Sequence, residues 1–342
     1  MITRKLTLFQ KVVIVNSLLI SQIWYRTQTY PLSQQWVNKI NKILCKFIWG
    51  SANNPIKHEI MTLGKREGGM SLINIEIKAK CIFACRILKQ FLIDKKQHSL
   101  LLYYIAMRLN PIFNIRSLPI NIGIVSTPYF EEGIAVIRSI LHLKGFPNIN
   151  SKSAYQYLLE RNVPTVQQRY PFSNWKNIWL NMNFRFIPVR TREILFKYLH
   201  GILPNKYRLK QIRISASDLC DVCGVPETNI HMMYQCQEIS AVKDFLVRLF
   251  AHFEFYNVNM AQLIMLDLPK VEKKLKNTLI FVSSLYIASI WFGRSRKHQI
   301  LSSLKACIIR ERRILEEILQ DKLIDLFIEP FCSLNKDNIE RI

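Results

Sequence analysis

The sequence has few glycines and prolines for its length. Of its 342 residues, 10 are glycine and 13 are proline, whereas 49% are hydrophobic and 11% are aromatic. This composition excludes a disordered or low-complexity polymer. A single hydrophobic core stops growing at about this length, so we expect two or more domains.

Long uninterrupted hydrophobic runs are also missing. Four polar residues interrupt the run 6–25, and the run 279–292 is shorter than the roughly 20 residues that a spanning helix needs. Lys11 breaks the apolar N-terminus, and no small-residue cleavage site follows it. We therefore expect an intracellular protein, nuclear or cytoplasmic, with no signal peptide, transmembrane segment or membrane partner. A mitochondrial presequence is the weaker alternative, favoured by eight basic and no acidic residues in 1–58.

Acidic residues are scarce in the first two thirds of the chain. The chain carries 48 Lys and Arg against 24 Asp and Glu, a formal net charge of +24. Residues 1–130 hold 18 basic and 4 acidic side chains, and residues 133–217 hold 14 and 2, whereas residues 218–342 hold 16 of each. Such a positive charge on a chain that can fold predicts a polyanionic partner, foremost RNA or DNA.

Apolar periodicity predicts a mainly α fold. The second expected helix begins after Ser33, and its apolar residues at spacings of three and four predict one buried stripe: Trp36, Ile40, Ile43, Leu44, Phe47 and Ile48. Scattered prolines predict irregular packing between residues 110 and 188. The other helices are expected at 6–29, 76–91, 191–203, 205–212, 243–255, 270–299 and 301–328.

Four residues follow the spacing of a zinc site. Cys220, Cys223, His231 and Cys236 form the pattern Cys-x2-Cys-x7-His-x4-Cys. Three thiolates and one imidazole complete a tetrahedral shell and leave no position for a catalytic water, so the expected Zn²⁺ is structural. The alternative is four unconnected residues in a chain with eight cysteines. Because no secretory signal accompanies them, these cysteines favour thiols or metal ligation over disulfides.

Two passages together resemble non-LTR (LINE-type) retrotransposon reverse transcriptases. The first, at 6–11, 15–19, 31–32, 47–50, 56–57 and 67–72, is similar to the thumb and post-thumb region. The second is similar to the zinc-binding domain near the C-terminus of those polyproteins, and comprises 203–205, Arg208, Leu209, the four zinc ligands, Glu227, Thr228, Ile290, Trp291 and Arg294. The resemblance implies a thumb-like helical bundle at 1–110, an irregular basic linker at 111–217, a CCHC zinc knuckle at 218–238 and long C-terminal helices at 239–342.

The resemblance implies nucleic-acid binding without polymerisation by this chain itself. Polymerases of the family use adjacent aspartates in a Tyr/Phe-x-Asp-Asp turn to hold two metal ions, and no Asp-Asp occurs here. Tyr129-Phe130-Glu131-Glu132 has a similar pattern, but it follows the thumb-like passage and is interpreted as a solvated acidic turn. One alternative is a fragment of an active reverse transcriptase whose palm lies upstream.

Basic residues next to the expected helices and the zinc motif are the candidate nucleic-acid contacts. Tyr207 and Tyr198 are available to stack on bases. The cationic candidates are Lys39, Lys42, Lys46, Arg185, Arg190, Arg192, Lys197, Lys206, Arg208, Lys210 and Arg213. The other interpretation of each is a solvated helix face.

An alternative function, of a different class, is that of an interaction protein that self-associates through its C-terminal helices. The stripe Leu304, Ile308, Leu315, Leu319 and Leu326 would then form the interface. The simpler interpretation packs this stripe against the helix at 270–299.

Overall fold

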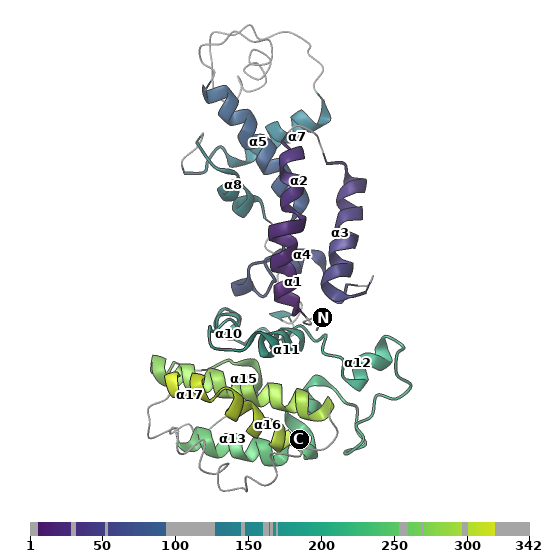
Figure 1. Ribbon diagram of the computed structural model, residues 1–342, viewed down its shortest axis with the longest axis vertical. Helices are drawn as coiled ribbons and strands as arrows, with labels where there is room; N and C mark the ends of the chain where they lie inside the picture. The colour runs from purple at the N-terminus through teal and green to yellow at the C-terminus, as the bar shows by residue number, and fades with distance from the viewer. Residues whose placement is uncertain are drawn as a thin grey trace, which may run out of the picture. The chain divides into compact units, whose positions relative to one another are not determined.

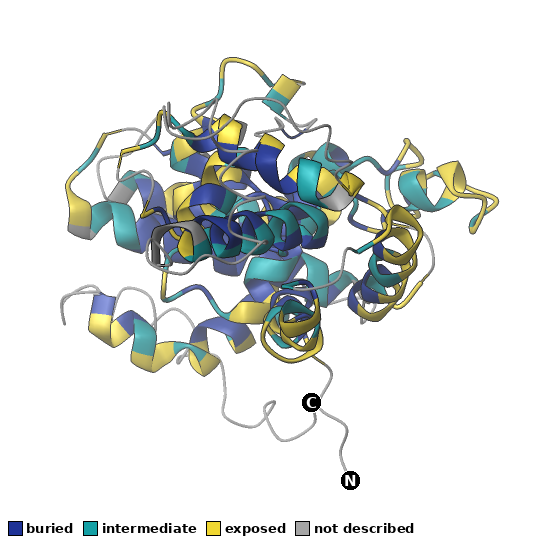
Figure 2. Ribbon diagram, turned by 90° about the horizontal axis from the view of Figure 1, so that it is seen from above, coloured by how far each residue is buried: buried dark blue, intermediate teal, exposed yellow. Residues whose placement is uncertain are grey.

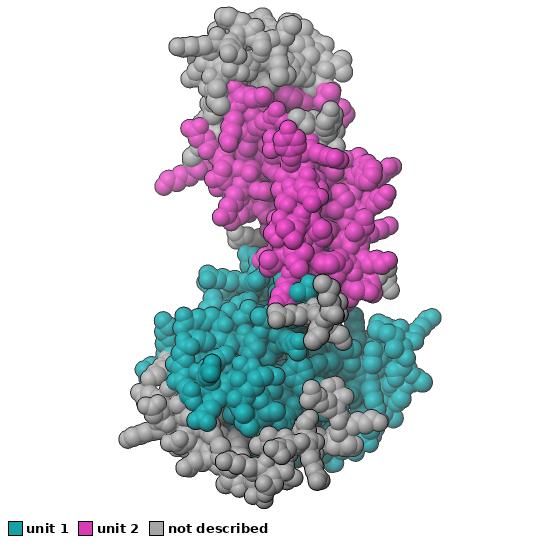
Figure 3. All heavy atoms as spheres, in the orientation of Figure 1, with its two compact units in different colours: residues 1–9, 64–69, 163–342 teal, residues 10–63, 70–162 magenta. Residues whose placement is uncertain are grey.

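The protein forms two compact helical units (Figures 1 and 3). The computed structural model describes residues 6–28, 32–51, 54–93, 127–144, 148–159, 164, 167–168, 170–252, 259–268, 270–295 and 300–318. Unit 1 comprises Met1–Phe9, Gly64–Gly69 and Val163–Ile342, and unit 2 comprises Gln10–Leu63 and Met70–Asn162. Within the described residues there is no strand, only a bridge between Leu219 and Pro226, which confirms the mainly α prediction. The predicted boundaries at 110, 217 and 238 stay predictions.

Unit 2 is built around helix α5. Its helices are α2 (Ser21–Arg26), α3 (Gln34–Trp49), α4 (His58–Thr62), α5 (Ile75–Ile93), α7 (Pro128–Ile140), α8 (Ser151–Leu158) and most of α1 (Leu8–Ile14), which joins α2 through the π-turn Val15–Leu19. Helices α7 and α8 pack on α5, and Ala84, Leu88 and Ile137 are among the residues of their common core. The Tyr155 hydroxyl, on α8, accepts a hydrogen bond of 2.9 Å from the Asn74 N–H at the start of α5.

Helix α3 has one buried and one exposed apolar stripe. Leu44 and Ile48 are buried as predicted, but Trp36 is 56%, Ile43 59% and Phe47 38% exposed, so the prediction of one buried stripe was wrong for these three. Residues spaced by three and four form two adjacent stripes on a helix, and only one of them faces the core here. Figure 2 shows helices with exposed residues in yellow on one side and buried residues in dark blue on the other.

Unit 1 surrounds helix α15 (Lys273–Ser295). Helices α11, α13 and α16 pack against it, and every residue from 279 to 290 is buried, as in a helix that is covered on all sides. The Tyr286 hydroxyl satisfies its hydrogen-bonding capacity by donating to the Met233 carbonyl at 2.9 Å. The other helices are α10 (Trp175–Met182), α11 (Val189–Leu199), α12 (Lys206–Gln211), α13 (Ser240–His252), α14 (Met260–Met265), α16 (Ile300–Arg310) and α17 (Arg312–Ile318).

The segment 64–69 of unit 1 packs on α10 and α11. Gly68 lies in the left-handed region, with φ of 88°, and an added Cβ would stand 2.6 Å from Cε2 of Trp179. The Gly68 carbonyl oxygen lies 2.8 Å from Nε2 of His200, whose ring stacks on Trp179 with centroids 5.5 Å apart. Only glycine fits this close approach of backbone to ring.

Three expectations from the sequence need correction. The irregular packing expected between 110 and 188 is wrong for the described part, which holds α7, α8 and α10. Glu131 and Glu132 lie in the first turns of α7 rather than in an acidic turn. The single helix expected at 301–328 is interrupted at Glu311, between α16 and α17.

The C-terminal apolar stripe packs within unit 1. Leu304, Ile308 and Leu315 are buried on helices that contact α15, as the simpler interpretation predicted. Leu319 and Leu326 lie outside the described residues.

Two described stretches are long and apolar enough to cross a membrane by length and composition alone, namely Leu8–Arg26 and Leu275–Arg294. The second is 72% buried inside unit 1. Length and composition are weak evidence here, because the core helix of a soluble protein has the same properties.

Candidate metal centre and nucleic-acid interface

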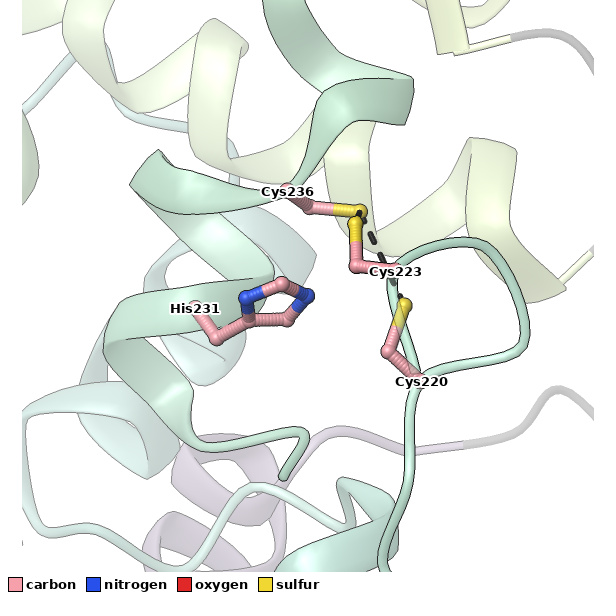
Figure 4. Close-up of side chains that lie close together, drawn as sticks. All are labelled: Cys220, Cys223, His231 and Cys236. Carbon is pink, nitrogen blue, oxygen red and sulfur yellow. Dashed lines mark hydrogen bonds between the residues drawn. The ribbon is translucent and has the colours of Figure 1, made fainter. Parts of the chain in front are cut away.

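The four predicted zinc ligands converge in unit 1 (Figure 4). Their ligand atoms all lie within 4.8 Å of one another. The Sγ atom of Cys236 is 3.8 Å from that of Cys220 and 3.7 Å from that of Cys223. Zinc–thiolate bonds of about 2.3 Å, arranged tetrahedrally, place two sulfurs about 3.8 Å apart, so the thiols are already spaced for the ion.

A tight turn positions Cys220 and Cys223. The Cys220 N–H donates to the Val225 carbonyl at 2.8 Å, and the Gly224 N–H donates to the Cys220 carbonyl at 3.0 Å. Gly224 adopts a φ of 68°, which closes the turn directly after the second thiol. The bridge between Leu219 and Pro226 holds the two ends of this turn together.

A π-turn, His231–Gln235, supplies the imidazole and leads directly to Cys236. The Thr228 hydroxyl accepts a hydrogen bond from the His231 N–H at 3.1 Å, and the Cys236 N–H donates to the His231 carbonyl at 2.8 Å. The Gln237 N–H points at the Cys223 sulfur from 3.4 Å. Amide donors of this kind stabilise a metal-bound thiolate and orient it.

Burial shifts the pKa of two of the ligands, His231 and Cys236. It lowers the pKa of His231, which keeps the imidazole neutral and able to bind a metal at neutral pH. It raises the pKa of Cys236 to about 12; the neighbouring thiols of Cys220 and Cys223 raise it further, and a hydrogen bond from the Glu238 backbone opposes the increase. A divalent cation compensates for the cost of placing thiolates here, since a coordinated thiol is deprotonated.

A small cavity adjoins the ligands. Its volume is about 20 Å³, and Cys220, His231 and Cys236 are among its lining residues, together with Glu227 and Arg294. The Nε2 atom of His231 is buried and has no hydrogen-bond partner among the described residues. An unsatisfied imidazole nitrogen facing three sulfurs fits a structural Zn²⁺, held by the four predicted ligands.

A buried carboxylate links the zinc-binding loop to two helices. Glu227 is 3% exposed and forms an ion pair with Arg294 in the last turn of α15. Its other oxygen accepts a hydrogen bond of 2.6 Å from the Lys206 N–H at the start of α12. Sequence reasoning missed this role. The only signal was that the resemblance includes both Glu227 and Arg294, without pairing them.

The cationic candidates fall into three groups by their partners among the described residues. Arg192 donates to the carbonyls of Phe184 and Ile187 at 3.0 and 3.2 Å, which gives it a role in holding the local backbone. The ion-paired group is Arg185 with Glu317, Lys197 with Glu193, Lys206 with Asp221 and Lys210 with Asp218. No acidic partner among the described residues is found for Lys39, Lys42, Lys46, Arg190, Arg208 and Arg213.

The candidates without acidic partners lie on two surfaces. Lys39, Lys42 and Lys46 are exposed on α3, where they occupy one helix face beside the exposed Trp36 and Phe47. The Lys39 ammonium lies 4.9 Å from the centre of the Trp36 ring. The other three lie in unit 1. Arg208 is on α12, Arg190 is exposed in the first turn of α11, and Arg213 is exposed shortly before the zinc-binding loop.

The two tyrosines proposed to stack on bases differ. Tyr207 is 41% exposed on α12 and remains available. Tyr198 is 9% exposed, and burial raises its pKa, so its proposed stacking role is wrong. Tyr198 lies on the buried face of α11. The sequence pattern around this residue does not show which face of the helix is buried.

Comparison with known families identifies this part of the chain. Residues 150–242 match the family model described as zinc-binding in reverse transcriptase. The match contains all four ligands, so it supports the structural zinc and a C-terminal region of a reverse transcriptase. No curated protein matches the chain significantly.

Proposed function

We propose that this chain is the nucleic-acid-binding C-terminal portion of a LINE-type retrotransposon reverse transcriptase, which grips template and primer or target DNA and does not itself copy or cut. The observation that carries the proposal is a set of cationic side chains without acidic partners among the described residues: within the region that matches the zinc-binding family model, Arg190 and Arg213 are exposed and Arg208 is half-buried. Free guanidinium and ammonium groups bind backbone phosphates and release condensed counterions.

The zinc ion has a structural role in this proposal. When bound, it fixes the 220–236 loop and thereby the start of α12 through Glu227. Helix α12 then presents Arg208 and Tyr207 on a rigid element, which favours nucleic-acid contact over solvation of a mobile loop.

The alternative of an active polymerase fragment keeps the same binding role. It differs only in an upstream palm that supplies the catalytic aspartates, and an in-frame Tyr/Phe-x-Asp-Asp in the genomic sequence upstream would favour it. Self-association through the C-terminal helices remains a separate prediction, and its stripe would have to use residues other than the buried Leu304, Ile308 and Leu315.

The test compares two triple variants with equal charge. The first replaces Arg190, Arg208 and Arg213 by Gln, and the second replaces the ion-paired Arg185, Lys197 and Lys210 by Gln. Each variant lowers the net charge by three. We expect the first to weaken binding of a 20-nucleotide RNA and of duplex DNA at least tenfold more than the second, as measured by fluorescence anisotropy. Equal weakening would show that only net charge matters and would contradict the assignment.

A further inference from the structure

A cavity of about 460 Å³ lies in unit 1 beside the zinc-binding loop. Helix α12, the end of α11 and residues 228–230 line it, together with Tyr170 and the end of α14. Its volume is within the range of roughly 300–1,000 Å³ that small-molecule sites occupy. The zinc ligands are not among its lining residues, so the cavity is distinct from the metal site.

The walls of the cavity combine flat rings with aliphatic side chains. Tyr170 and Tyr207 contribute phenol rings, and the buried side chains of Tyr198, Leu199 and Ile264 are also among the lining residues. Such a surface favours a planar, partly apolar ligand, because aromatic faces stack on one another. The ring that is open to solvent is Tyr207, which is 41% exposed, whereas Tyr198 is buried.

Two polar side chains that line the cavity, those of Arg208 and Gln211, are not engaged by other protein groups among the described residues, whereas Asn205, Thr228 and Asn229 already form hydrogen bonds. Tyr207, Arg208 and Gln211 lie on one side of α12 and line the cavity. Among the described residues, neither the Arg208 guanidinium nor the Gln211 amide forms an ion pair or hydrogen bond, whereas Lys206 and Lys210 of the same helix pair with Asp221 and Asp218. A free guanidinium fork binds phosphate, and a free amide pairs with the edge of a base.

We propose that this cavity binds one unpaired nucleotide of a single-stranded nucleic acid. The base stacks on Tyr207 and meets the Gln211 amide, while Arg208 holds the adjoining phosphate. A base within a duplex cannot enter a concave site without leaving its stack, so the cavity selects unpaired over paired segments. The inference rests on the proposed nucleic-acid-binding function and specifies where single strands are distinguished from duplexes.

The experiment measures affinities of the full chain for three fluorescein-labelled probes: a 12-nucleotide oligouridylate RNA, the matching deoxyoligonucleotide, and a 12-base-pair DNA duplex. Tyr207→Ala and Gln211→Ala are compared with Tyr157→Ala, whose side chain is 47% exposed on α8 of unit 2. We expect Tyr207→Ala to weaken binding of single strands at least about fivefold, the lower end of what one stacked base contributes, and to leave duplex affinity unchanged. Loss on the RNA alone or on the DNA alone would identify which strand the cavity takes.

A second readout excludes an effect through folding. Zinc content and melting temperature of Tyr207→Ala should equal those of the wild type, because the side chain is exposed. A 5-iodouridine version of the RNA should cross-link to the peptide that contains residue 207. If Tyr207→Ala binds single strands within twofold of the wild type, or loses duplex affinity equally, the cavity inference is wrong while the proposed function stands. If the wild type binds none of the probes, the proposed function fails as well.

Discussion

The buried Glu227 and the partly exposed Arg294 form an ion pair between the zinc-binding loop and the last turn of α15. The two residues are 67 positions apart. Removing one partner of a buried pair leaves the other charge desolvated and unpaired. The pair therefore makes the position of the zinc loop depend on the core helix of unit 1.

The first prediction concerns this pair. Glu227→Ala should lower the free energy of unfolding by about 2 kcal/mol, since it leaves the partly exposed Arg294 unpaired and removes the acceptor of the Lys206 N–H. Urea denaturation in the presence of zinc measures the change. Glu238→Ala, an exposed carboxylate in the same region, is the control and should change stability by less than about 0.5 kcal/mol. A Glu227 variant as stable as the Glu238 variant would show that the pair contributes nothing.

The second prediction concerns the metal. The purified chain should contain one equivalent of zinc, and Cys220→Ser or His231→Ala should lose it, because three ligands leave the tetrahedral shell incomplete. Cys45→Ser is the matched control, since Cys45 is a buried thiol of unit 2 outside the site. Elemental analysis by mass spectrometry measures the content. Full occupancy in His231→Ala would remove His231 from the ligand set.

The third prediction concerns the glycine that approaches Trp179. Gly68→Ala should destabilise unit 1 by more than about 2 kcal/mol, because it adds left-handed backbone strain to a clash with the indole ring. Gly50→Ala is the control: Gly50 also has a positive φ, of 75°, but nothing lies within 4 Å of its added Cβ. It should cost about 1 kcal/mol, from the backbone alone. Equal losses in the two variants, seen by thermal melting, would argue against the clash.

The fourth prediction concerns pH. Burial lowers the pKa of His200 to about 4, against the opposing effect of its hydrogen bond to Gly68. The unfolded chain binds this proton near pH 6.5 and the folded chain near 4, so stability falls as the pH decreases through this window.

His200→Gln should remove that dependence. Between pH 7 and pH 4, the free energy of unfolding of the variant should therefore decrease by on the order of 2 kcal/mol less than that of the wild type. Comparing the two proteins separates His200 from acid release of zinc, which both share. Parallel pH profiles of the free energy of unfolding would contradict the assignment.

Periodicity and spacing predicted the helices and the zinc ligands well, because both depend on local sequence. The start of α3 after Ser33 and the four ligands are cases where a local signal was sufficient. Which apolar stripe of α3 meets the core depends on partners elsewhere in the chain, so Trp36 and Ile43 were wrongly predicted to be buried.

Long-range partners also explain what the sequence could not reveal at the site. The pairing of Glu227 with Arg294 and the burial of Tyr198 both follow from the packing of α11 and α15. The prolines between 110 and 188 predict irregular packing, but Pro128 begins α7, where its fixed φ suits the first turn.

The central claim is that unpaired basic side chains bind nucleic-acid phosphates, and the salt dependence of binding tests it most directly. For the full chain and a duplex DNA, the logarithm of the association constant should fall linearly with the logarithm of salt concentration. Replacing Lys39, Lys42 and Lys46 by Gln should reduce that slope by about three, since each phosphate contact contributes about 0.9. An affinity that does not change with salt, or a slope that the triple variant leaves unchanged, would contradict the account.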